Sequence, residues 1–167
     1  MSVGLPPRSP STSHVPVTCD ERQIRLLSAA RRHVADAERL LQESPDQAWH
    51  LAGFGPECAR KAGLFDGGLA ARVVDQRLGH DFGPFADQVL DWVSRLDRHA
   101  HRYQLDGWTA QYPVLGSWSP NHRYDATGTV TTRDVNGLVA TARQLVDRVS
   151  AELWMDGLLP KAWGPTS

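Results

Sequence analysis

The feature that most constrains the fold is an apolar stripe of helical period, which recurs in separate segments of the chain. In the first segment its members recur at steps of three or four residues, at Ile24, Leu27, Ala30, Val34, Ala37 and Leu41. The last segment repeats the pattern at Val135, Leu138, Ala142, Leu145, Val149 and Leu153. One face of an α-helix has this period, and such a face must be buried against a partner. No segment shows a sustained strand period, so the chain is predicted to be all-α.

Capping signals predict where the first two helices begin. The stretch Thr18-Cys-Asp-Glu21 has the form of a capping box, which predicts that the first helix begins at Thr18. Ser44 and Pro45 suit the N-cap and the first position of a second helix, predicted over about residues 45–64.

Two further helices are predicted later in the chain. One spans about residues 79–103 and carries an apolar stripe at Phe82, Phe85, Val89, Trp92, Leu96 and Tyr103. The other spans about residues 132–155, and Gly157 is a suitable terminator for it. Four such helices, with short connectors except one, predict an antiparallel up-and-down four-helix bundle.

The long connector, residues 104–131, is the segment most expected to carry function. It has no sustained period and is rich in Gly, Pro, Trp and Tyr. Connectors of this length inside a compact domain are usually functional or disordered. Trp108, Tyr112 and Trp118 argue for order, because burial of aromatic rings stabilises a loop. We therefore expect the loop to pack on the bundle.

The length of 167 residues fits a single domain. Residues 1–17 are rich in Pro and Ser and are predicted to be a disordered tail, residues 18–157 the bundle, and residues 158–167 a C-terminal tail. No apolar run is long enough to cross a bilayer, which predicts a cytoplasmic protein without a membrane partner. A net charge of -1 gives no strongly basic surface, so RNA is a less favoured partner than a small molecule.

Several short motifs follow one another along the chain: AERLL at 37–41, ECARKA at 57–62, GHDF at 79–82 and WSPNHRY at 118–124. Their order resembles the HEPN family over about residues 18–153. The resemblance implies a helical bundle that often forms a homodimer. Many members are similar to metal-independent ribonucleases that use an arginine and a histidine with four to six residues between them, near the start of the last helix.

The chain departs from that nuclease motif. Arg123 stands in the place of the arginine, but the positions of the histidine hold Gly128, Thr129 and Val130. Arg95 and His101 have the spacing, yet they fall on the predicted third helix. A ribonuclease toxin or defence component therefore remains an alternative, as does a non-catalytic partner subunit, because fold and function are separable.

The candidate site combines helix ends with the loop. Arg123 can bind a phosphate, sulfate or carboxylate bidentately. His80 beside Asp81 can act as a general base steered by a carboxylate, or can simply cap a helix. Glu57 and Lys61 stand one helical turn apart, as a surface ion pair or as ligand contacts. Further contacts to a ligand are expected from Trp118, Asn121, His122 and Tyr124.

No metal and no cofactor are predicted. His99 and His101 are two residues apart and point to different sides of a helix, so they do not form a metal site with His122. The predicted function is binding of an anionic small molecule or nucleotide in a pocket between the helices and the 104–131 loop. If the protein is an enzyme of a biosynthetic pathway, Arg123 holds a leaving group while His80 or Asp81 takes a proton.

Overall fold

Three long helices form the framework of the protein in the computed structural model. They are α1 (Glu21–Leu40), α2 (Pro45–Ala62) and α7 (Thr132–Met155). The structure describes residues 18–64, 88–89, 91–92, 95, 100–103 and 108–164. Every regular element in these ranges is an α-helix or a 3-10 helix, which confirms the all-α prediction. None of the helices in the described ranges combines the length and the apolarity that crossing a membrane requires.

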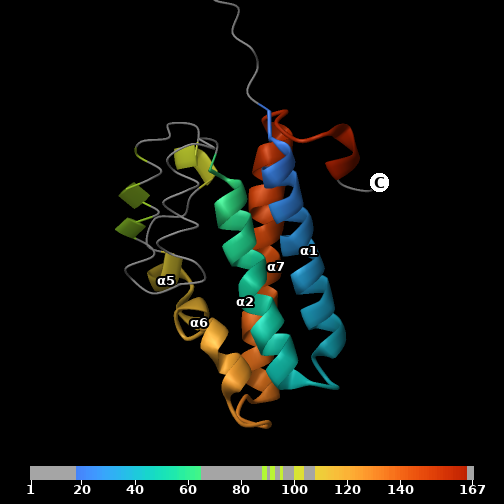
Figure 1. Cartoon of the computed structure of the whole chain (residues 1–167), viewed down its shortest axis with the longest axis vertical. Coiled ribbons are helices and arrows are strands. Elements are labelled where there is room, and N and C mark those ends of the chain that lie inside the picture. The colour runs from blue at the N-terminus through green and yellow to red at the C-terminus, as the bar shows by residue number, and fades with distance from the viewer. Residues whose placement is uncertain are drawn as a thin grey trace, which may run out of the picture.

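The three helices lie side by side (Figure 1). A short turn after α1 reverses the chain, so α2 runs antiparallel to α1, and α7 runs in the same direction as α2 (Figure 1). Of the predicted helix over about 79–103, the structure describes residues 88–89, 91–92 and 95, which are helical, and the 3-10 helix η2 (Ala100–Tyr103). The antiparallel four-helix arrangement therefore stays a prediction, while the helical framework is observed.

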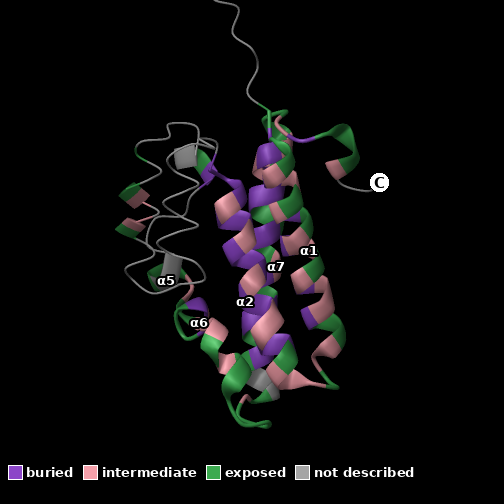
Figure 2. Cartoon of the chain, viewed as in Figure 1, coloured by how far each residue is buried: buried purple, intermediate pink, exposed green. Residues whose placement is uncertain are grey.

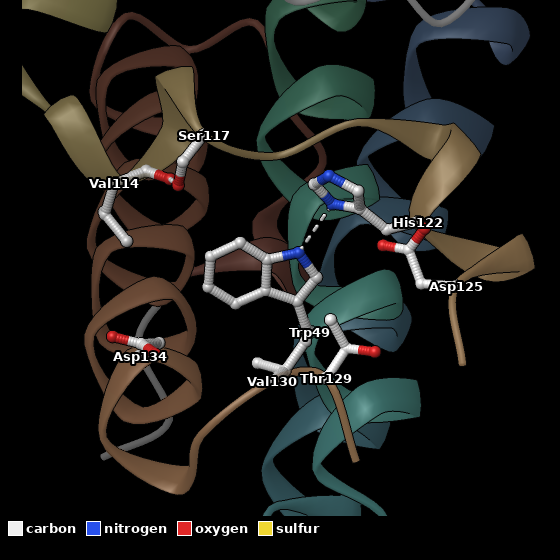
Figure 3. A pocket seen from close by; sticks show the side chains of 8 residues that line it. All are labelled: Trp49, Val114, Ser117, His122, Asp125, Thr129, Val130 and Asp134. Carbon is white, nitrogen blue, oxygen red and sulfur yellow. Dashed lines mark hydrogen bonds between the residues drawn. The ribbon is translucent and has the colours of Figure 1, made fainter. Parts of the chain in front are cut away.

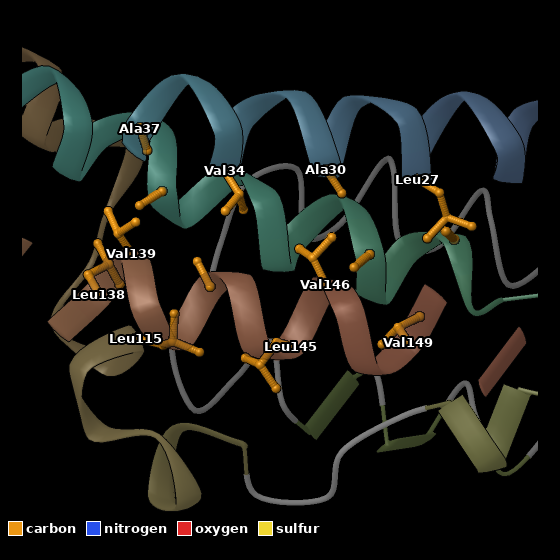
Figure 4. Close-up of a cluster of buried hydrophobic side chains, with 14 of the residues drawn as sticks. Leu27, Ala30, Val34, Ala37, Leu115, Leu138, Val139, Leu145, Val146 and Val149 are labelled. Carbon is orange, nitrogen blue, oxygen red and sulfur yellow. The ribbon is translucent and has the colours of Figure 1, made fainter. Parts of the chain in front are cut away.

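The core lies where the stripes of α1 and α7 meet α2. Buried positions gather along the facing sides of the helices (Figure 2), and their side chains interdigitate in the close-up of Figure 4. The stripes contribute the fully buried residues Leu27, Ala30, Val34, Ala37, Val135, Leu138 and Ala142. Burial of such side chains is the main favourable term in folding, so these stripes hold the framework together.

The start of α1 differs from the capping box predicted at Thr18. The N-cap is Asp20, whose carboxylate accepts from the Gln23 backbone N–H, while Gln23 Oε1 accepts from the Asp20 N–H, both at 2.8 Å. The buried Gln23 amide also donates to the carbonyl oxygens of Ala62 at 2.8 Å and Leu64 at 3.3 Å. Gln23 thus joins the start of α1 to the end of α2, and this tertiary contact places the cap two residues later.

The 104–131 connector is ordered over its described part, as expected. It contains α5 (Trp108–Gln111), α6 (Pro113–Gly116) and η3 (Pro120–Tyr124). The Trp118 side chain is buried against α2, where a Cβ on Gly53 would lie only 2.1 Å from the indole. Gly53 therefore leaves the space that Trp118 fills, and this contact fixes the connector to the framework.

Residues 158–164, predicted as a tail, pack on the framework instead. Gly157 ends α7 with a φ of 73°, a left-handed conformation that glycine adopts without strain. The chain then turns back, Leu159 is buried, and the Cys19 N–H donates to the Leu158 carbonyl at 3.0 Å. The segment finishes in η4 (Lys161–Trp163). The folded unit thus extends beyond residue 157.

Candidate functional site

The 3-10 helix η3 is fixed locally before it contacts any other element. Its N-cap, Ser119, accepts a hydrogen bond from the Asn121 N–H at 3.2 Å, and the Ser119 N–H donates to His122 Nδ1 at 3.2 Å. Pro120 occupies the first helical position, where its missing N–H has no consequence. This capping presents His122, Arg123 and Tyr124 on a short rigid turn.

A hydrogen bond to Trp49 of α2 orients His122. The Trp49 indole N–H donates to His122 Nδ1 at 2.9 Å (Figure 3), so Nδ1 accepts from both the indole and the Ser119 backbone. A ring nitrogen that accepts cannot carry the proton, which assigns the proton of the neutral imidazole to Nε2. His122 is therefore suited to donate from Nε2 to a ligand oxygen, and this tautomer is unsuited to act as a general base.

Basic groups gather where η3 lies on α2. Burial lowers the pKa of His50, and the charges of Arg123, His122 and His33 lower it further. His50 Nδ1 is buried and has no hydrogen-bond partner among the described residues. Arg123 is exposed, with its guanidinium carbon 4.7 Å from the centre of the Tyr124 ring. The electrostatic potential of this face therefore favours a negative charge.

A cavity of about 390 Å³ lies beside His122, between the connector and the N-terminal end of α7 (Figure 3). Its lining residues are Trp49, Val114, Ser117, His122, Asp125, Thr129, Val130 and Asp134. The charged members are two carboxylates, Asp125 and Asp134, and neither Arg123 nor Tyr124 is among the lining residues. These carboxylates would repel an anion, and the described lining residues include no Lys or Arg, so the expected anion site stays a prediction and is sought outside this cavity.

Asp46, in the first turn of α2, closes the connector. Its carboxylate accepts from the Gly128 N–H at 2.7 Å and from the Val130 N–H at 3.1 Å. These two bonds hold the stretch before α7 against α2. Asp46 thus shapes the cavity wall without lining the cavity itself.

Glu57 and Lys61 do form an ion pair, but it is not on the surface. Lys61 Nζ lies 2.6 Å from Glu57 Oε1, and the two side chains are 13% and 6% exposed, respectively. The interpretation as a solvated surface pair is therefore wrong. A buried pair of this kind contributes little net stability, yet breaking it by removing one partner is costly. The two residues do not line the cavity beside His122.

The remaining predicted site residues are divided between structural roles and undescribed positions. Trp118 is a buried anchor whose indole N–H donates to the His50 carbonyl at 3.2 Å, and Asn121 is exposed in the first turn of η3. His80 and Asp81 lie outside the described residues, as do His99 and the side chain of His101. Arg95 is exposed and forms an ion pair with Asp91 at 2.8 Å.

Two residues that matter here, Trp49 and His50, were missed from the sequence. Both lie in the helix whose small residues were the basis of its interpretation from the sequence. The Trp49 indole reaches His122 of η3, which is 73 positions away in the chain. The adjacent Trp and His on a helix otherwise rich in small side chains were the only local signal. Within the described ranges, no group of three or more His, Cys, Asp or Glu side chains is arranged to hold a metal ion.

The comparisons with known proteins provide no relative for this site. No protein-family model, no curated protein and no solved structure matches the chain.

Proposed function

We propose that this chain is a HEPN-like helical protein that binds an anionic small molecule or nucleotide on the face where η3 lies on α2. The observation that carries the proposal is the grouping of basic side chains on this face, where the exposed Arg123 lies beside the Tyr124 ring and next to His122, which Trp49 orients. The pKa of His50 agrees with it, because it is lowered first by burial and then by the charges of Arg123, His122 and His33. A bound anion would offset this mutual repulsion. Arg123 and Tyr124 of this face do not line the carboxylate-lined cavity, whereas His122 is part of both.

Each group has a role that its geometry supports. The exposed guanidinium of Arg123 can grip a phosphate, sulfate or carboxylate through two N–H groups. His122 adds a single N–H donor from Nε2, because its Nδ1 is already occupied. The Tyr124 ring, 75% exposed, offers a flat surface for the ring of a nucleotide.

Binding is better supported than a reaction at this face. The tautomer of His122 leaves it a donor, and no step can be assigned to it as a base. A displacement that uses His80 or Asp81 remains a prediction on residues outside the described ranges. The ribonuclease alternative has less support, since Arg95 already pairs with the Asp91 carboxylate. Homodimerisation also remains a prediction drawn from the family resemblance.

The test is an NMR titration of the His50 imidazole in the full chain, with and without inorganic phosphate. We expect phosphate to raise the pKa of His50 towards its ordinary value of 6.5, because the bound anion stabilises the protonated ring. A mononucleotide should produce the same shift and also perturb the Tyr124 ring signals. An unchanged pKa of His50 with both ligands would refute the proposal.

Two variants distinguish specific binding of phosphate from a general effect of ionic strength on the pKa of His50. Arg123→Gln should remove most of the effect of phosphate, whereas Arg25→Gln should leave it intact. Arg25 is a suitable control because it is an exposed arginine in the early part of α1. That part of α1 lies beside the C-terminal end of α2, whereas His50 lies near the N-terminal end of α2. If the effect of phosphate were lost equally in both variants, it would be due to general ionic screening and not to binding at Arg123.

A further inference from the structure

A second cavity lies at the opposite end of α7 from η3. It has a volume of about 480 Å³ and lies between α1, the last turns of α7 and η4. Its apolar and aromatic walls are formed by Ala151, Trp154, Met155, Ala162 and Trp163, and its charged lining residues are Arg31 of α1 and Asp147 of α7. Met155 is 65% exposed, so its thioether side chain is accessible from solvent.

The wall that η4 provides is held firmly. Leu159 is buried in the core, and the Trp163 N–H donates to the Pro160 carbonyl at 2.9 Å. The chain then passes so close to α7 that a Cβ on Gly164 would lie 2.8 Å from the Trp154 ring. The two indoles therefore occupy set positions, which favours a preformed pocket over a loose surface groove.

Arg31 is the cation of this cavity, and Asp147 of α7 is the one carboxylate among its described lining residues. Its guanidinium carbon lies 4.4 Å from the centre of the Trp163 ring, a cation–π arrangement. Burial lowers the pKa of Arg31, the Asp147 carboxylate raises it, and the charge of Arg143 lowers it. No ion pair to Arg31 is found among the described residues.

The neighbouring charges do not take the place of a partner for Arg31. Asp147 is 57% exposed and lies 3.9 Å from the guanidinium of Arg143, so water and that arginine screen it. Arg143 is in turn bound by Glu38, with its Nε 2.9 Å from Glu38 Oε1. A partly desolvated, planar guanidinium thus remains available to a carboxylate from outside the chain.

We propose that this cavity is a binding site for a planar aromatic carboxylate. The ring system would lie against Trp154 and Met155, where indole and thioether surfaces favour aromatic partners. The carboxylate would accept two N–H bonds from Arg31, whose stacking on Trp163 holds its fork in place. This site is independent of the anion face at η3 and involves none of the residues proposed there.

The probes are 2-naphthoate and two isosteric relatives, the neutral 2-naphthamide and the cationic 2-naphthylmethylamine. Binding to the full chain is followed through the indole N–H signals of Trp154 and Trp163 in NMR spectra, assigned with Trp→Phe variants. We expect saturable shifts of both signals with 2-naphthoate and binding at least about tenfold tighter than that of the amide or the amine.

Substitutions at Arg31 test the role of its guanidinium. Arg31→Gln should abolish the preference for the carboxylate, and Arg31→Lys should retain only part of it, because lysine keeps the charge but not the planar fork. Arg25→Gln, on the same helix, should bind as the original chain does, and circular dichroism checks that each variant is folded.

Several results would overturn the proposal. These are the absence of a saturable shift, equal binding of the three probes, and an unchanged preference in Arg31→Gln. Shifts of the two indole signals that depend on protein concentration without a probe would show that a second copy covers the cavity. Phosphate titration at His50 provides a separate readout, so a failure at one site is distinguishable from a failure at the other.

Discussion

The three-helix framework and the connector over residues 108–131 are stabilised in different ways. The framework buries continuous apolar stripes, so each of its helices is held by many side chains along its length (Figure 4). The connector is held by a few separate contacts, at Trp118, at the bond from Trp49 to His122, and at Asp46. The chain therefore presents its candidate ligand groups on a segment that a single substitution can release.

Removal of the Trp118 anchor should have the largest effect on this difference. Trp118→Ala deletes a side chain that is 3% exposed and packs edge-on against Phe54 with ring centres 5.1 Å apart. Loss of a buried aromatic residue of this size typically costs about 3–5 kcal/mol. We expect the free energy of unfolding to fall by that amount, measured by urea denaturation, and His122 to lose its contact with Trp49.

Tyr124→Ala is the matched control, since it removes an exposed aromatic side chain from the same connector. Its free energy of unfolding should change by less than about 0.5 kcal/mol. A comparable loss in the two variants would mean that the connector is not anchored mainly through Trp118.

The second prediction concerns the buried Gln23 amide, which joins α1 to α2. Gln23→Leu keeps an apolar side chain of similar size but leaves the carbonyls of Ala62 and Leu64 and the Asp20 N–H without this partner. A buried polar group that is left without a hydrogen bond costs about 1–3 kcal/mol. Water at the helix ends should reduce this cost. We expect a loss of about 2 kcal/mol, smaller than that of Trp118→Ala. Gln42→Leu, at an exposed glutamine just after α1, should be close to neutral.

The third prediction tests the polar closure of the connector. Asp46→Asn replaces a carboxylate that accepts from Gly128 and Val130 with an amide that has one acceptor oxygen. We expect a loss of about 1 kcal/mol in the free energy of unfolding and faster hydrogen exchange at the two amides. Hydrogen exchange of the backbone amides in α2 should be unaffected. Unaltered exchange at Gly128 and Val130 would show that Asp46 does not hold this stretch.

The same contrast explains what the sequence allowed one to predict. The helices follow from a local period, and the bounds of α7 agree with the prediction because its cap and terminator lie within a few residues of its ends. The cap of α1 was predicted two residues too early, because the Gln23 amide donates to the carbonyl oxygens of residues 62 and 64 and so fixes the first turn of the helix. The partnership of Trp49 with His122 is a contact across 73 positions, which no local pattern reveals.

The smallest predicted effect is a dependence of stability on pH that arises from His50. Its pKa in the folded protein lies below the ordinary value of 6.5, through burial and then through the charges of Arg123 and its other basic neighbours. The unfolded chain therefore takes up a proton more readily, so stability is complete above about pH 6.5 and declines as the pH falls towards the lowered pKa.

We expect urea denaturation to show this decline in the free energy of unfolding between about pH 7.5 and 5.5, and His50→Gln to reduce the decline. His33, whose pKa is also lowered by burial, should supply the part that remains. Stability that increased on acidification through this range would show that His50 is charged in the folded protein, and hence that an acidic partner, and not a basic face, surrounds it.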